Sequence, residues 1–198
     1  YGPCAFLDAH DPAAVFSSID RQGRYAYGNQ PLLARWNLAR LGETLMPLMA
    51  ENPAEALPAV QAAIEGAEGL YASERRRVFG AKLGVDDDSL IDRFLDMLTA
   101  QGADFTGSFR ALVAAARGEV AGLRAQIGTD PRLEGWLAEW QARRVLGAEA
   151  LAAANPLYIP RNHRVEEALA AATAGDLAPF HRLMAVLLDL MLPGMSGY

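Results

Sequence analysis

Apolar residues recur at helical spacing through most of this chain. From Leu33 onward they return every three to five positions, which is the spacing of one face of an α-helix. The first stripes follow residues 33–48 and 69–83, and later ones follow 90–98, 109–113, 133–140, 165–173 and 178–191. The pattern predicts a mainly α-helical body with little sheet.

Capping residues mark where these helices begin and end. Asn52-Pro53 is expected to end the first helix and start the next, with Asn52 as the N-cap. Gly84 and Gly102 are typical of the residue that follows a helix. Further boundaries are predicted at Asp104, Asp130-Pro131, Asn155-Pro156 and Gly175-Asp176. The connections are short and no repeat of fixed period occurs, so we expect a packed helical bundle with irregular angles.

The first 31 residues differ from the rest. Their Gly and Pro residues are spaced so that no helix fits, at Gly2, Pro3, Pro12, Gly23, Gly28 and Pro31. Short extended pieces are expected near residues 14–16 and 24–27. A long loop before a helical body is typical of a functional segment or of part of something larger. Because the chain opens on Tyr1 without an initiator methionine, we expect it to come from a longer protein.

Composition narrows the class of protein. The chain is 52% hydrophobic and 21% charged, which is typical of a globular protein. Its net charge of −6 argues against broad binding of nucleic acid. No apolar run reaches 18 residues, so no membrane segment is expected. The single cysteine, Cys4, excludes an internal disulfide and fits a reducing compartment, so we expect a bacterial cytoplasmic protein.

The loop holds two weak candidates for chemistry. Asp8, His10 and Asp11 leave open a metal site, and with it a metal-dependent hydrolase. Cys4 leaves open a nucleophile with His10 as its base, although a buried loop thiol is the commoner role. No Ser-His-Asp set, phosphate-binding glycine loop or zinc-ligand spacing is found in the sequence.

One acidic cluster in the helical body suggests a cation at first sight. A calcium loop that began at Asp86 would need glycine at its sixth position and glutamate at its twelfth. Those positions hold Ile91 and Met97. Asp86, Asp87 and Asp88 therefore favour a helix start, where negative charge is stabilising.

Other features of the helical body favour structural roles. Glu74–Arg77 is expected to be a solvated helix face, with contact to a phosphate or a partner left open. Arg161–Arg164 follows a proline at the head of a helix, where caps and ion pairs are expected. Trp36, Trp136 and Trp140 lie on apolar stripes and are predicted to be core residues.

A series of short motifs, in order over almost the whole chain, resembles the selenoprotein O family, called YdiU in bacteria. The matching motifs are Tyr1-Gly2-Pro3, Phe6–Ala9, Gly23–Tyr25, Tyr27–Pro31, Trp36–Leu41, Ala81–Gly84, Asp104–Thr106, Phe109-Arg110, Trp136-Leu137, Asn155-Pro156, Tyr158-Ile159, Arg161–His163 and Gly175-Asp176. The resemblance implies a protein adenylyltransferase with a protein-kinase-like fold. Such an enzyme transfers AMP from ATP to Ser, Thr or Tyr hydroxyls of proteins, with magnesium or manganese.

The resemblance also implies that the catalytic parts lie upstream. In the family an aspartate precedes Y-G-P and holds the metal on the nucleotide phosphates. This chain begins one residue later, so Tyr1 and Gly2 are the nearest residues to that site. The glycine-rich region, the phosphate-binding lysine, the catalytic base and its metal-binding asparagine would also lie upstream. We therefore expect no catalytic, cofactor-binding or metal-binding residue within residues 1–198.

On this interpretation residues 1–33 are an activation-loop-like segment and residues 34–198 are the helical C-terminal lobe. The partner is the upstream kinase-like N-terminal region, and the isolated chain neither binds ATP tightly nor transfers AMP. Phe16 stands where some members carry a loop cysteine, and His10 stands where an aromatic residue is frequent, so redox control through the loop is not expected. The alternative is a stand-alone helical interaction module without enzymatic activity.

Overall fold

The computed structural model describes residues 6–191, with the side chains of residues 6–186. Within that range the chain forms nine α-helices and two short 3-10 helices, and it contains no strand. The prediction of a mainly helical protein is confirmed. The features predicted at Tyr1, Gly2, Pro3 and Cys4 lie outside the described residues.

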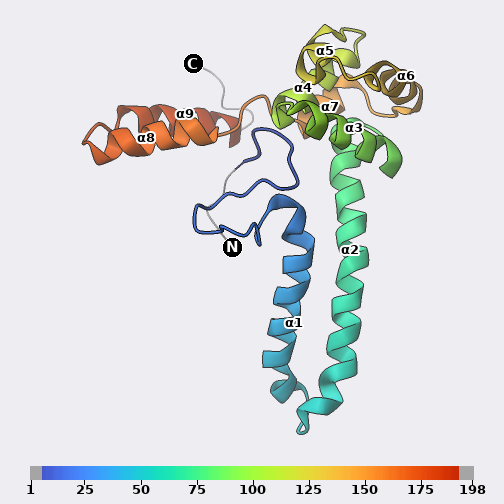
Figure 1. Cartoon of the computed structure of the whole chain (residues 1–198), viewed down its shortest axis with the longest axis vertical. Coiled ribbons are helices and arrows are strands. Elements are labelled where there is room, and N and C mark those ends of the chain that lie inside the picture. The colour runs from blue at the N-terminus through green and yellow to red at the C-terminus, as the bar shows by residue number, and fades with distance from the viewer. Residues whose placement is uncertain (1–5, 192–198) are drawn as a thin grey trace.

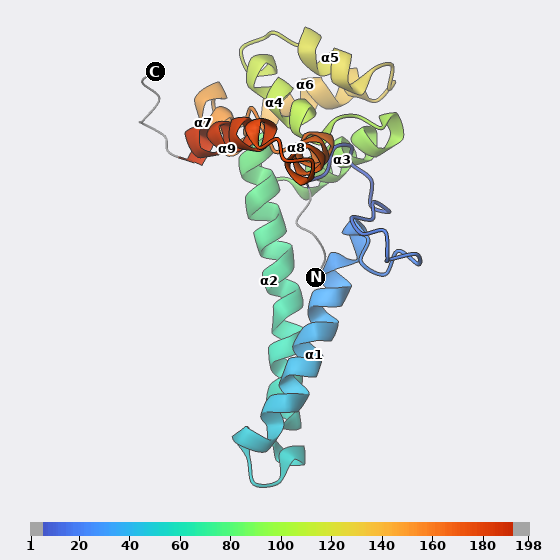
Figure 2. The ribbon, with the colours of Figure 1, turned by 90° about the vertical axis from the view of Figure 1, so that its left-hand side faces the viewer.

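Two long helices form an antiparallel arm. Helix α1 (Gln30–Met49) is followed by a 3-10 turn (Pro53–Ala56) and by α2 (Leu57–Leu83), which runs back alongside it (Figures 1 and 2). The predicted cap is present, because the side chain of Asn52 accepts a hydrogen bond from the Ala54 N–H at 3.2 Å. The two helices approach closely at Gly42, where an added Cβ would lie 2.4 Å from a methyl carbon of Val60.

The sequence interpretation placed a new helix at Gly69, and this is wrong. Helix α2 is continuous through Gly66 and Gly69. An interior glycine costs a helix about 1 kcal/mol relative to alanine, but it does not force an end. The flanking alanine, glutamate and leucine residues are good helix formers and keep the helix intact.

Five helices pack at one end of α2 as a compact head. They are α3 (Asp88–Gln101), α4 (Phe105–Ala115), α5 (Ala121–Ile127), α6 (Leu133–Arg143) and α7 (Ala148–Ala154). Their side chains and the end of α2 enclose the core, in which Trp136 and Trp140 are buried as predicted. Each indole N–H donates to a backbone carbonyl, to Leu90 at 2.9 Å and to Leu83 at 2.7 Å. The polar end of each ring is therefore satisfied inside the core.

The third tryptophan was predicted to be a core residue, and it is not. Trp36 is 50% exposed, and it lies on α1, outside the head. Arg24 and Arg40 lie over its ring at 5.0 and 5.6 Å from the ring centre. The apolar stripe alone could not distinguish a core position from a half-exposed ring that two guanidinium groups cover.

The predicted helix boundaries in the head are mostly confirmed. Asp87 accepts from the Leu90 N–H at 3.1 Å and caps α3, as the acidic cluster predicted. Gly84 and Gly102 follow α2 and α3 with φ angles of 73° and 57°, a conformation that favours glycine. Asp104 caps α4 by accepting from the Gly107 N–H.

The last two helices form a separate pair beside the head. Helix α8 (Asn162–Thr173) begins three residues before the predicted Val165, and α9 (Ala178–Met191) has the predicted bounds (Figure 1). The predicted packed bundle thus describes α3–α7, whereas the arm and the α8–α9 pair project from it. No helix of the described range is both long and apolar enough to cross a membrane.

The segment before α1 forms a folded loop and contains neither of the expected extended pieces as a strand. Backbone hydrogen bonds join its two halves, from Tyr27 N–H to the Ala14 carbonyl at 2.9 Å and from Gly28 N–H to the Pro12 carbonyl at 2.8 Å. An added Cβ at Gly28 would lie 3.0 Å from the Pro12 oxygen, a tight contact, so the close approach favours glycine.

Candidate functional site

The beginning of the described chain is attached to the head. The Phe105 N–H donates to the Asp8 carbonyl at 2.8 Å, and Ala9 forms an isolated antiparallel bridge with Asp104. The His10 ring, only 6% exposed, stacks on Phe105 with 5.8 Å between ring centres. Residues 8–10 are therefore held against the start of α4.

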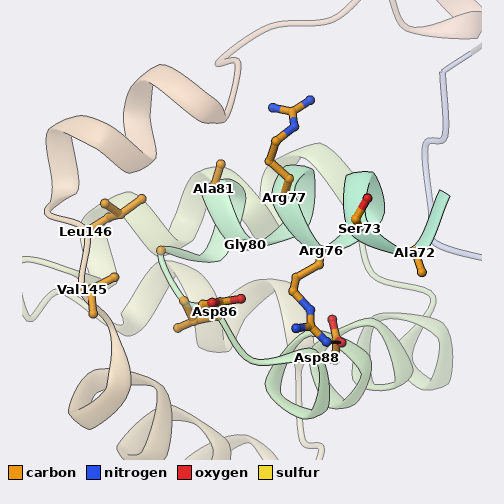
Figure 3. Close-up of a pocket in the computed structure, with 12 residues that line it drawn as sticks. Ala72, Ser73, Arg76, Arg77, Gly80, Ala81, Asp86, Asp88, Val145 and Leu146 are labelled. Atoms are coloured by element: carbon orange, nitrogen blue, oxygen red, sulfur yellow. Dashed lines mark hydrogen bonds and ion pairs between the residues drawn. The ribbon is translucent and has the colours of Figure 1, made fainter. Parts of the chain in front are cut away.

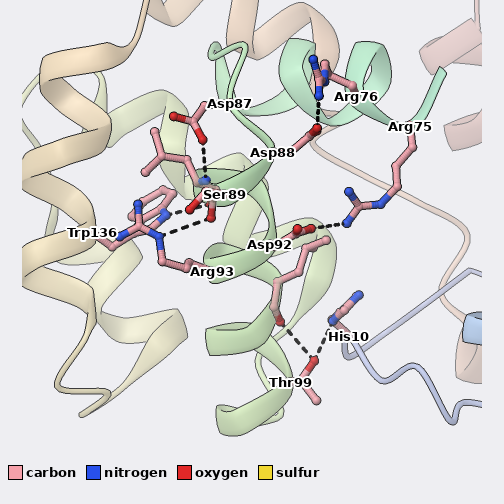
Figure 4. A network of polar contacts seen from close by, with 12 residues as sticks. His10, Arg75, Arg76, Asp87, Asp88, Ser89, Asp92, Arg93, Thr99 and Trp136 are labelled. Carbon is pink, nitrogen blue, oxygen red and sulfur yellow. Dashed lines mark hydrogen bonds and ion pairs between the residues drawn. The ribbon is translucent and has the colours of Figure 1, made fainter. Parts of the chain in front are cut away.

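His10 is anchored through one ring nitrogen. Its Nδ1 lies 2.8 Å from the Thr99 hydroxyl oxygen, and that hydroxyl lies 3.1 Å from the Leu95 carbonyl, to which it donates (Figure 4). With the hydroxyl hydrogen donated to Leu95, the matching tautomer carries its proton on Nδ1 and donates it to the Thr99 oxygen. Burial lowers the pKa of His10 below its usual value, so the neutral ring is favoured.

Arg161 joins the loop to the helical head. Its guanidinium binds both carboxylate oxygens of Asp104, with Nη2 3.0 Å from Oδ1, and its Nη1 lies 3.1 Å from Asp8 Oδ1. The next residue, Asn162, donates to the Phe6 carbonyl at 2.9 Å and to Asp8 Oδ2 at 3.4 Å. We call the four side chains of Asp8, Asp104, Arg161 and Asn162 the loop clamp. It connects residues far apart in sequence at one point.

The clamp keeps the Asp104 carboxyl ionised. Burial alone would raise the pKa of the Asp104 carboxyl, but the Arg161 guanidinium and the Gly107 N–H outweigh it and lower that pKa. Asp104 therefore stays ionised while it caps α4 and binds Arg161. The pairing was predicted in kind, since Arg161 was expected to form an ion pair, but its partners could not be identified from the sequence.

A second connection lies beneath the loop. The fully buried Asn155 donates to the Lys82 carbonyl at 2.8 Å and accepts from the Lys82 ammonium at 3.2 Å. Lys82 also lies 5.1 Å from the centre of the Phe109 ring, and burial lowers the pKa of its ammonium. The sequence singled out Lys82 only as a motif residue, and Asn155 as a motif residue and a helix boundary, which the end of α7 at Ala154 confirms. The sequence did not show that these two residues are linked. It also did not show that Asn155, at the Asn155-Pro156 break, anchors the end of α2.

A cavity of about 1080 Å³ lies between the loop and the head. Apolar side chains contribute much of its wall, with Phe6, Val15 and Tyr25 from the loop and Phe105 and Ile159 from the head. Arg21, Arg24 and Lys82 also line it, together with Asp20, so both signs of charge are present. The apolar wall can hold an apolar or aromatic group.

A smaller hollow of about 600 Å³ lies at the end of α2 (Figure 3). Arg76 pairs with Asp88, and Arg77 pairs with Glu74 at 2.7 Å. Their side chains are 55% and 69% exposed, so the predicted solvated helix face is confirmed. Because each guanidinium already has a carboxylate partner, the hollow offers a phosphate no free cation from this pair.

The loop residues proposed as metal ligands do not converge. Asp8 binds Arg161, His10 binds Thr99, and Asp11 accepts from the Ala13 N–H at 2.8 Å. Among the described residues, no three His, Cys, Asp or Glu side chains gather as a metal site. The metal-dependent hydrolase hypothesis therefore loses its basis in residues 6–191.

Comparison with known proteins gives the family. The model of the family described as protein adenylyltransferase SelO matches residues 1–188. A protein of Cereibacter sphaeroides named protein nucleotidyltransferase YdiU is 49% identical over 195 residues, which cover 96% of this chain and 40% of that protein. Proteins of the same name from Chromobacterium violaceum and Rhodococcus jostii are 47% and 48% identical, and the match covers 42% and 38% of their lengths. The chain thus spans about 40% of the length of these relatives, and it belongs to the SelO protein adenylyltransferase family.

Proposed function

We propose that this chain is the C-terminal part of a protein adenylyltransferase that transfers AMP from ATP to hydroxyl groups of proteins. Family membership supports the reaction, and the matched share of the relatives supports a partial chain. The polypeptide upstream would carry the kinase-like nucleotide-binding region, and residues 34–198 would form the supporting helical lobe.

The loop clamp is the observation that carries the role of this chain. Arg161 and Asn162 hold Asp8 and the backbone of Phe6, a few residues after Tyr1-Gly2-Pro3. In the proposal, the aspartate that precedes Tyr1 binds the metal on the ATP phosphates. Phosphoryl-type chemistry depends on exact placement of such groups. The clamp would therefore position the metal-binding segment against the helical lobe.

The described residues themselves do not fit a nucleotide-bound metal, because no cluster of carboxylate, histidine or cysteine ligands forms among them. A hard divalent cation such as magnesium requires oxygen ligands, chiefly carboxylates, at close range. Asp8 and Asp104 are already paired with Arg161. We therefore assign metal binding to the upstream region, and the family resemblance assigns ATP binding there as well.

The test compares two polypeptides. One is residues 1–198 alone, and the other joins these residues to the N-terminal region of the Cereibacter sphaeroides relative. Each is incubated with labelled ATP, magnesium or manganese, and a generic protein acceptor. We expect metal-dependent labelling only by the joined polypeptide. Labelling by residues 1–198 alone that is abolished by Asp8→Ala or Asp11→Ala would overturn the proposal and move the chemistry into the loop.

The second candidate is a stand-alone interaction module, and the exposed apolar surface of the arm favours it. The same experiment separates the two functions. An interaction module would transfer no label in either form, and it would bind a partner protein without the upstream region.

A further inference from the structure

Helix α1 carries an apolar stripe that the described part of the chain leaves largely exposed. Leu38, Leu41, Leu45 and Leu48 are spaced by three, four and three residues, which is the spacing of a helix seam that packs against a partner. Their exposed fractions are 41%, 53%, 42% and 82%. We call these four residues the leucine stripe. Such spacing with such exposure is unusual, because leucine side chains at seam positions are normally buried.

The outer part of the stripe, Leu41 and Leu48, lies about 100° or more around α1 from the face toward α2, whereas Leu38 and Leu45 lie nearer to that face. The face toward α2 is marked by Gly42, whose added Cβ would touch Val60. Within α1, all of which the structure describes, no residue is buried. In both views of the ribbon, α2 is the only helix that runs alongside α1 (Figures 1 and 2). Leu41 and Leu48 therefore form an apolar edge that no described helix faces.

We propose that the leucine stripe is the surface on which the upstream part of the same polypeptide packs. This inference rests on the proposed function, because it requires that a larger N-terminal region precedes Tyr1. The relatives support it, since the match covers only 40% of the Cereibacter sphaeroides protein. About 60% of that protein therefore lies outside the matching segment. Covering an apolar face of this kind stabilises the protein by about 25 cal/mol for each Å² of apolar surface that is removed from water.

The path of the chain also favours an upstream occupant. A few residues after its attachment to the head, the loop passes beside the first turn of the arm, because Pro12 accepts a hydrogen bond from Gly28 and His10 contacts the Tyr27 ring with 5.8 Å between ring centres. Tyr27 begins the short 3-10 turn that leads directly into α1. A region joined ahead of this loop is therefore delivered to the vicinity of α1 at high effective concentration.

A second copy of the chain fits the stripe less well. The leucine spacing is sustained only over residues 38–48, whereas a self-associating coiled coil sustains it over roughly three to four heptads. The stripe stops with α1 at Met49, so it cannot extend into a longer seam. A few exposed turns suit packing against a larger folded region of the same polypeptide.

The experiment is hydroxyl-radical footprinting of the joined polypeptide, in which oxidation reports the exposure of each side chain. Leu70 is the matched internal control, because it is a leucine of the same arm on α2 with 69% exposure. If nothing covers the stripe, Leu48 at 82% exposure is oxidised at least as fast as Leu70. We expect Leu48 and Leu41 to be oxidised at least threefold more slowly than Leu70.

Two results would overturn the inference. One is oxidation of Leu48 as fast as that of Leu70. The other is slow oxidation of Leu41 and Leu48 that appears only at concentrations where sedimentation shows a dimer. A second copy of the chain would then be the occupant of the stripe. The readout does not depend on AMP transfer. Labelling of the acceptor with fast oxidation of Leu48 contradicts only this inference, and slow oxidation without labelling contradicts only the proposed function.

Discussion

The head and the arm are built from the same kind of sequence pattern and end in opposite environments. In the head, the stripe of Leu90, Phe94 and Leu98 is fully buried. In the arm, the leucine stripe of α1 also follows helical spacing, on a less amphipathic helix, and it has no buried member. Periodicity thus specifies that a helix has an apolar face, whereas burial depends on whether another element is present to cover it.

The largest expected contrast between the two regions is in stability. Phe94→Ala should destabilise residues 1–198 by about 3–5 kcal/mol, because the ring is fully buried. Its centre lies 4.8 Å from the centre of the Trp136 ring and 5.1 Å from that of Phe109. Leu41→Ala in the same chain should change stability by less than about 0.5 kcal/mol. Urea unfolding followed by circular dichroism measures both. Equal losses would mean that α1 is buried in this chain and that the comparison fails.

A smaller effect is expected where the loop joins the head. Arg161→Ala removes the only cation of the loop clamp and leaves Asp104 without a partner in it and Asp8 with Asn162 alone, so we expect the docking of the loop to weaken by about 1–3 kcal/mol. Hydrogen exchange of the Phe105 amide, which donates to the Asp8 carbonyl, measures the loss.

Arg164→Ala is the matched control for this substitution. Arg164 is an arginine in the same helix, 64% exposed and paired only with Glu167 among the described residues. Exposed pairs contribute about 0–1 kcal/mol, so the amide of Phe105 should exchange at the normal rate. Equal protection in the two variants would contradict the role of the clamp.

The docking of the loop should also depend on pH. Because burial lowers the pKa of His10, the neutral ring is favoured in the folded protein. The contribution of this neutral ring to stability is complete above the unfolded pKa of about 6.5. It decreases as pH falls through that value toward the folded pKa. Asp11 and Asp96 oppose the shift, and Arg75 supports it.

The measurement is the thermal midpoint between pH 7.5 and 5.5. We expect part of the decline toward pH 5.5 to disappear in His10→Gln. His163→Gln, at an exposed histidine outside the loop, should leave the decline unchanged. An identical decline in the wild-type chain and in both variants would show that His10 does not titrate with loop docking.

Much of the fold could be predicted from the sequence because its signals are local. Caps such as Asp87 and Asp104, and the glycines after α2 and α3, act within a few residues of their own position. The loop clamp is different, since Arg161 meets Asp8 across 153 positions. A single sequence contains the charges but not their pairing. The exposure of Trp36 was missed for the same reason, because its stripe does not show which element covers it.

The smallest expected effect tests whether the arm is one continuous helix at the point where the sequence indicated a break. Nothing lies within 4 Å of a Cβ added at Gly69, so Gly69→Ala should stabilise the chain by about 0.5–1 kcal/mol through helix propensity. Gly42→Ala is the opposite case in the same arm, because its new methyl group would collide with Val60 and should lower stability. Thermal unfolding of the two variants gives the signs. If Gly69→Ala lowered the midpoint, a helix end at Gly69 would be the better interpretation, and the long arm that presents the leucine stripe would have to be redrawn.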